Sequence, residues 1–190
     1  IATEASFYFP TSVAFDSLSN MYRADQQNNV VRKVDKNTGM ISTIAGNGYG
    51  AGSSGSIGGY SGDGGPAILA ELDWPSCLAF YKGGLYIADQ INGAIRKVDM
   101  KTGKITTVAG VLGAPGYNTT SGPATSVQLY NPTGVAFDTS GNMYIADFNN
   151  YLVRKVTSGT MSTFAGNPLL GAGYGGDGGP ATGPFAQLYQ

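Results

Sequence analysis

Short apolar runs separated by turn residues recur along the chain, and the clearest set lies between residues 131 and 166. Four runs, at 134–138, 142–147, 152–157 and 161–166, are rich in Val, Ile, Phe, Tyr or Thr. Gly, Asn and Ser residues stand between them. Runs of this length and composition, interrupted by turn formers, are typical of β-strands joined by tight turns. The segment therefore predicts a four-stranded antiparallel meander.

The same pattern occurs twice upstream, from Pro10 to Gly46 and from Pro75 to Gly110. Its first prolines, Pro10, Pro75 and Pro132, follow one another at intervals of roughly 60 residues, and a four-stranded unit repeated at about this spacing is the signature of β-propeller blades. The chain is therefore predicted to be all-β, with three four-stranded antiparallel meanders that form an open half-propeller. We place everything in one propeller segment, 1–190, with blades at about 10–46, 75–110 and 132–166 and Gly-rich connectors at 47–74, 111–131 and 167–190.

Both faces of each predicted sheet are largely apolar, as expected for a sheet packed between two others. Arg23 breaks this pattern, because the other two copies have Ile87 and Ile145 at its position. We expect Arg23 to lie at an exposed first blade or across an interface. An apolar residue also stands three positions before each first proline and predicts a plug against the neighbouring blade. The candidate interface residues are Phe7, Phe9, Arg23, Leu188 and Tyr189.

Each copy carries the pattern Asp-x-x-Asn-x-x-x-Arg across the turn between its second and third runs. Asp and Asn suit turns because their side chains bond nearby backbone amides. The Asp and Arg flank the turn, so we expect them to pair across the hairpin. One carboxylate per blade supplies few oxygens for a cation such as Ca²⁺, so the structural interpretation is favoured. The predicted pairs are Asp25 with Arg32, Asp89 with Arg96, and Asp147 with Arg154.

Two of the three connectors share a Gly-rich motif that contains an acidic residue, Asp63 in one and Asp177 in the other. No Lys follows the glycines and no helix is predicted after them, so a phosphate-binding loop is not expected. We expect each Asp to cap its own turn. A ligand or metal site formed by these loops is the alternative.

Composition and charge argue against a nucleic-acid or membrane partner. The net charge is −1, so the chain offers no basic stripe for a nucleic acid. No apolar run is long enough to insert into a membrane. The chain has no His and one cysteine, Cys77, which we expect to be a small buried residue. The sequon Asn118-Thr119-Thr120 is a candidate glycosylation site and favours an extracellular or secreted location.

The repeated strings PTGVAFDTSGNMYIADFNNYLVRKV and GYGGDGGPAT resemble NHL repeats of the variety with GYSGDGGPA-type connectors. The resemblance covers the chain in three copies. It implies a β-propeller, typically of six blades, that serves mostly as an interaction platform. One enzymatic branch of the family relies on metal-binding histidines, which this chain lacks. The resemblance therefore implies neither an enzymatic activity nor a cofactor.

Three blades cannot close a ring, so two bare blade faces are expected to require cover. Two chains that close a ring, identical chains that stack into a filament, and a portion of a longer propeller are three outcomes consistent with this. The favoured function is a non-enzymatic extracellular module that self-assembles by blade-to-blade packing. The alternative is a ligand-sensing or protein-binding ectodomain fragment of a longer six-bladed propeller. The predicted partners are copies of the chain or the rest of such a propeller, with no nucleic acid and no membrane insertion.

Overall fold

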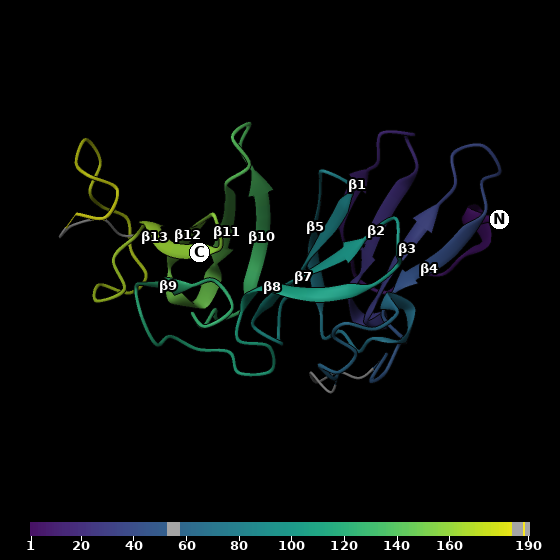
Figure 1. Cartoon of the computed structure of the whole chain (residues 1–190), viewed down its shortest axis with the longest axis horizontal. Helices are drawn as coiled ribbons and strands as arrows, with labels where there is room; N and C mark the ends of the chain where they lie inside the picture. The colour runs from purple at the N-terminus through teal and green to yellow at the C-terminus, as the bar shows by residue number, and fades with distance from the viewer. Residues whose placement is uncertain (53–57, 184–187, 189–190) are drawn as a thin grey trace.

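The computed structural model describes residues 1–52, 58–183 and 188, and three antiparallel sheets follow one another in an arc (Figure 1). Blade 2 lies in the middle, with blade 1 and the N-terminus on one side and blade 3 on the other. Blade 1 contains β1 (Pro10–Phe15), β2 (Met21–Asp25), β3 (Val30–Val34) and β4 (Ile41–Ala45). Blade 2 contains β5 (Pro75–Tyr81), β6 (Gly84–Asp89), β7 (Ala94–Asp99) and β8 (Ile105–Gly110). Blade 3 contains β10 (Pro132–Phe137), β11 (Met143–Asp147), β12 (Leu152–Thr157) and β13 (Thr160–Ala165).

The three meanders share one register, which confirms the repeat predicted from the sequence. In each blade the first proline lies opposite the turn Asp, and a bulge follows directly after it. A bulge at the same place in each blade turns the first strand in the same way. The pairs are Pro10 with Asp25, Pro75 with Asp89, and Pro132 with Asp147.

The connectors add structure that the sequence pattern did not predict. β9 (Ser121–Pro123) pairs with β13, so the third sheet has five strands rather than four. In blade 2 the corresponding connector makes only a single bridge, from Pro66 to Lys104. Four short 3-10 helices complete the described chain: η1 (Ala2–Glu4), η2 (Gln26–Asn28), η3 (Ala67–Leu69) and η4 (Phe148–Asn150). No helix in the described part of the chain is long and apolar enough to cross a membrane.

Two apolar clusters fill the spaces between blades. In each, the Tyr of the second strand meets the Phe of the next blade's first strand: Tyr22 with Phe80 at 4.7 Å between ring centroids, and Tyr86 with Phe137 at 4.6 Å. Edge contacts of this kind stabilise beyond the burial of their area. Cys77 packs against the second cluster and is half-buried rather than fully buried as expected.

The predicted plugs are present at both interfaces. Leu72 and Leu129 are fully buried in the first and second clusters. Phe7, the equivalent residue before blade 1, is only half-buried. The difference follows from packing, because among the described residues no blade covers this side of blade 1.

The end of each blade's fourth strand passes close to the turn of the same blade. Gly110 has φ +85°, and a Cβ there would collide with the carbonyl oxygen of Gly93. Gly103 also has positive φ, at +69°, but a Cβ there would meet nothing within 4 Å. Substitution of Gly103 therefore imposes the cost of a left-handed backbone alone, whereas substitution of Gly110 adds a collision with Gly93.

We expect Gly103→Ala to cost about 1 to 2 kcal/mol of unfolding free energy, the cost of a left-handed backbone alone. Gly110→Ala should cost several kcal/mol, because the backbone must also move. Urea unfolding followed by circular dichroism measures both. Equal losses in the two variants would show that the close approach of strand and turn is not a constraint on the blade.

Candidate functional site

A buried aspartate organises the turn in every blade. In blade 3, the Asp147 carboxylate accepts the backbone N–H of Tyr130 at 2.8 Å, the Asn150 amide at 2.9 Å and the Arg154 Nε at 2.9 Å. One side chain thereby joins the segment that leads into the blade, the turn itself and the third strand. All three pairs predicted from the sequence form: Arg32 lies 3.8 Å from Asp25, Arg96 lies 3.2 Å from Asp89, and Arg154 lies 2.9 Å from Asp147.

Burial raises the pKa of two of these aspartates, Asp89 and Asp147. The pKa of Asp89 rises to about 6, although the nearby Arg96 opposes the rise. Because folding raises this pKa, the titration of Asp89 favours the folded state most below pH 3.8, where the carboxyl is protonated. This contribution to the free energy of unfolding is lost as the pH rises through about 6. Each carboxylate is nevertheless fully engaged by its neighbours in the blade, and the described residues contain no group of three or more His, Cys, Asp or Glu placed to hold a metal ion.

The connector before blade 2 is joined to that blade by Asp63. Its carboxylate lies 2.7 Å from Nη2 of Arg96 and accepts the backbone N–H of Thr107 at 2.8 Å. The contact with Arg96 is electrostatic, because the N–H is not aimed at the oxygen. The expectation that Asp63 caps its own turn is therefore wrong. Its partners lie in the third and fourth strands of the blade that follows.

The connector before blade 3 makes the same attachment without an acid. Thr120 stands at the position of Asp63, and its backbone carbonyl accepts Nη1 of Arg154 at 3.2 Å. The ring of Tyr117 lies 5.4 Å from the guanidinium carbon of Arg154. The side chains of Arg96 and Arg154 are both fully buried as a result. Each connector thus clamps the arginine of the next blade.

In the described part of the chain, no connector holds Arg32 of blade 1. Its side chain remains 23% exposed, and its ion pair with Asp25 is the longest of the three at 3.8 Å. Among the described residues, its Nε has no hydrogen-bond partner.

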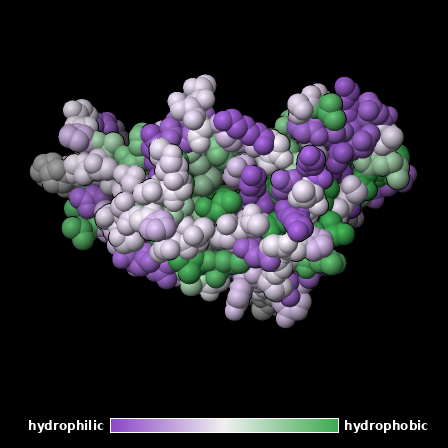
Figure 2. Space-filling model, viewed as in Figure 1, coloured by the Kyte–Doolittle hydropathy of each residue, from purple (hydrophilic) through white to green (hydrophobic). Residues whose placement is uncertain are grey.

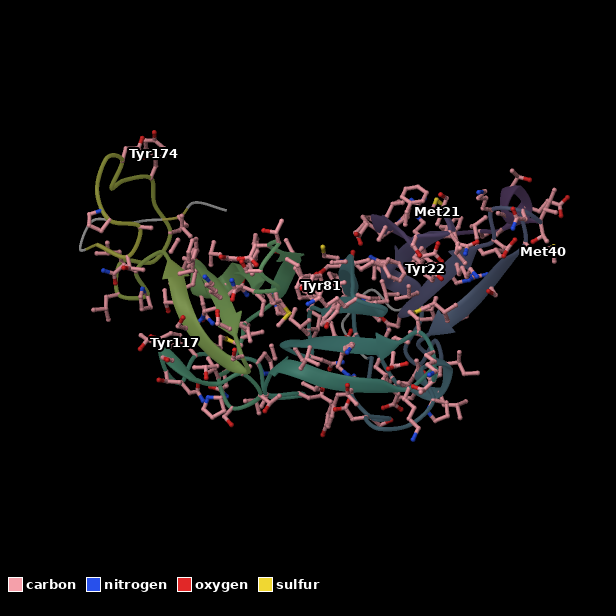
Figure 3. The ribbon with its side chains drawn as sticks, turned by 45° about the horizontal axis from the view of Figure 1, so that its top comes forward. Met21, Tyr22, Met40, Tyr81, Tyr117 and Tyr174 are labelled. Carbon is pink, nitrogen blue, oxygen red and sulfur yellow. The ribbon has the colours of Figure 1, made fainter. Side chains whose placement is uncertain are left out.

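Asp177 stands in the last connector at the position that Asp63 has in the first connector. The loop lies at the opposite end of the molecule from Met40 of blade 1, with Tyr174 near its tip (Figure 3). The Asp177 carboxylate accepts the Tyr174 hydroxyl at 2.8 Å, and both residues are exposed. Asp177 therefore bonds within its own loop, but to a side-chain hydroxyl and not to the backbone of the turn, as the expected cap would.

The outer face of blade 1 is bulky and uncovered. Phe15 is 60% exposed, Val13 is also exposed, and Arg23 lies over the ring of Phe7 at 4.8 Å. Phe9 is exposed at the same end of the chain. Hydrophilic and hydrophobic residues lie side by side on the surface at this end (Figure 2). The equivalents of Val13, Phe15 and Arg23 face the preceding blade, namely Leu78, Phe80 and Ile87 in blade 2 and Val135, Phe137 and Ile145 in blade 3.

The far face of blade 3 carries smaller side chains. Ala136 and Ala146 are exposed there, whereas Ala24 and Ala88, the equivalents of Ala146, are fully buried between blades. Tyr144 meets Phe164 of its own blade at 5.0 Å instead of a phenylalanine of a following blade. Leu188 shares a shallow hollow with Ala146, Val153 and neighbouring residues of this blade. Tyr189 lies outside the described residues.

Asn118 is exposed, as a glycosylation acceptor must be, but its side chain is already engaged. Its amide nitrogen donates to the carbonyl of Ser126 at 2.9 Å, and its oxygen accepts the N–H of Gln128 at 2.9 Å. The residue braces the connector before blade 3.

The two connector aspartates should respond differently to removal of their charge. Asp63→Asn should lower the unfolding free energy by roughly 1 to 2 kcal/mol, because it weakens a charged contact with a buried arginine. Asp177→Asn should leave this value unchanged, because the partner of Asp177 among the described residues is an exposed tyrosine. Urea titrations at low protein concentration test the pair. An unaffected Asp63→Asn variant would contradict a stabilising clamp.

Comparison with known proteins supports the repeat assignment. Residues 129–156, which include most of blade 3, match the NHL repeat family model. Protein SUPPRESSOR OF QUENCHING 1, chloroplastic, of Arabidopsis thaliana is 29% identical over 153 residues, which cover 80% of this chain and 14% of that protein. This chain thus corresponds to a small part of a much longer relative.

Solved structures share the fold at low identity. A protein of unknown function from Bacteroides thetaiotaomicron superposes with a TM-score of 0.68 at 21% identity, covering 95% of this chain and 40% of that chain. An auxiliary nutrient binding protein from Bacteroides ovatus gives 0.63 at 17% identity, covering 98% of this chain and 41% of that chain. Solved structures of similar fold also include an enzyme, a streptogramin B lyase. Blade 3 therefore carries a match to the NHL repeat, and the chain has the fold of β-propeller blades.

Proposed function

We propose that this chain is a non-enzymatic interaction module that associates through its two end faces by blade-to-blade packing. One observation carries the proposal. Each internal interface joins a bulky face on one blade to a face of alanines and a tyrosine on the blade before it. The outer face of blade 1 is bulky, and the far face of blade 3 has the alanines and the tyrosine. The two ends are therefore the two halves of a contact that the chain already makes twice.

The aromatic residues on the two end faces indicate how one molecule would align with the next. Tyr22 receives Phe80, and Tyr86 receives Phe137. Tyr144 and Phe15 are the next members of the same series, and each lies on an end face. Packing Phe15 of one molecule against Tyr144 of another would continue the series without any change in blade structure. Because the two faces differ, the association is head to tail, which gives either a closed ring or a filament.

The non-enzymatic part of the proposal rests on how the acidic residues are used. General acid and base chemistry needs a titratable group that can reach a substrate. The buried aspartates of the turns are instead bonded to backbone amides, an asparagine and an arginine of their own blade. The chain also contains no histidine.

An extracellular location fits an exposed sequon at Asn118 and the relation in fold to a nutrient-binding protein. The same relation favours a second candidate function, in which the chain is part of a longer six-bladed propeller that senses a ligand or binds a protein. This chain covers 41% of the nutrient-binding structure, as three blades of a larger ring would. In that case further blades of the same polypeptide would cover the two end faces.

Light scattering coupled to size-exclusion chromatography tests self-association. At micromolar concentration the molar mass should be a multiple of 19.6 kDa. Phe15→Ser should weaken association at least tenfold, because it removes an aromatic ring from the centre of the contact. Phe15 is exposed in the single chain, so folding should be unaffected.

Leu18→Ser is the matched control. Leu18 is 71% exposed, and Ser140, its equivalent in blade 3, is exposed as well, so this position lies outside the blade interface. The control should associate like the unmodified chain. A single 19.6 kDa species at every concentration would refute self-association and favour the longer-propeller alternative.

A further inference from the structure

The contact between a connector and a blade arginine is incomplete at both ends of the described chain, with the arginine present at one end and the connector at the other. The connector before blade 2 holds Arg96, and the connector before blade 3 holds Arg154. Among the described residues, no connector holds Arg32, and Asp177 of the last connector holds no arginine of a blade. We propose that Asp177 of one molecule pairs with Arg32 of a second copy and so fixes the head-to-tail contact. This inference rests on the proposed self-association and identifies the charged pair that would direct it.

The charges and surroundings of the two side chains are complementary. The Arg32 side chain stays 23% exposed and lies farther from its own aspartate than the arginines of the other blades do. The Asp177 carboxylate is exposed and accepts the Tyr174 hydroxyl, and Tyr174 is itself 84% exposed. In the middle blade the same two residue types meet at 2.7 Å, where the arginine is fully buried. Burial strengthens such a pair, because water no longer screens it.

The backbone beside the clamp also repeats. Ala67 accepts the N–H of Gly46 from the blade before it and donates its own N–H to Gly103 in the blade after it. Ala181 likewise accepts the N–H of Gly166 from blade 3. If blade 1 of a second molecule followed blade 3, the N–H of Ala181 would donate to the carbonyl of Gly39, which is the equivalent of Gly103.

That carbonyl is occupied in the single chain by the N–H of Ala2 at 2.9 Å. The short helix η1, to which Ala2 belongs, contains no buried residue. Replacing Ala2 by Ala181 of the neighbouring molecule therefore exchanges one backbone hydrogen bond for another. The first residues of the chain compete with the arriving connector, and weakening them should favour association.

Charge reversal in trans tests the pairing. Asp177→Arg alone and Arg32→Glu alone should each associate at least tenfold more weakly than the unmodified chain, because each places like charges together. An equimolar mixture of the two variants should recover association, since both contacts in the mixture then join opposite charges. Mass photometry or light scattering gives the mass of each sample. Recovery on mixing cannot arise from damage to the fold of either variant.

Two further variants keep the test decisive if Arg32→Glu does not fold beside the buried Asp25. Asp177→Arg changes an exposed loop only, and it should weaken association where Lys101→Glu, an exposed charge reversal in the middle blade, does not. Ala2→Pro removes the competing N–H and should strengthen association.

The outcomes separate the two claims. A monomeric unmodified chain would overturn both the proposed function and this inference. An unmodified chain that associates, together with an Asp177→Arg variant that associates equally well, would overturn the ion pair alone and leave the packing of the end faces in place.

Discussion

A sheet that is apolar on both faces is stable in water only where a neighbour covers each face. Blade 2 meets this condition, because its two faces take part in the two clusters that hold the molecule together. Blades 1 and 3 meet it on one side only. Phe15 and Val13 at one end, and Ala136 and Ala146 at the other, are exposed at positions whose counterparts lie within the interfaces. The fold and the proposed function therefore have one cause, the tendency of each blade to acquire a neighbour.

The polar groups of the blades serve the same packing. A buried carboxylate in each turn accepts a backbone amide of the segment that leads into the blade, and its arginine compensates the buried charge. The arginine also reaches outward to the connector, so a single side chain links the interior of one blade to the chain that enters it. An apolar face alone would tolerate many partners. A buried charge that needs one particular acid or carbonyl narrows the choice to a connector of matching sequence.

Much of this arrangement could be predicted from the sequence. The alternation of apolar residues gave strands within one or two residues of those observed, and the spacing of Asp and Arg predicted all three pairs. These features are local, because strand register in a tight hairpin follows from the turn. The NHL resemblance gave the relation between blades, which periodicity alone does not contain.

The contacts that the sequence did not reveal span long stretches of chain. Asp63 bonds to Thr107, a residue 44 positions later, and no local pattern indicates that partner. β9 forms because the connector before blade 3 reaches the last strand of that blade, which depends on the path of the loop and not on strand propensity. Asn118 was recognised only as a sequon, although its side chain also braces the connector through Ser126 and Gln128.

Direct imaging of the protein at micromolar concentration tests the central claim most directly. Electron microscopy should show rings or filaments in which blade 3 of one molecule lies against blade 1 of the next. A field of separate three-bladed arcs, each with both end sheets in contact with water, would contradict the account.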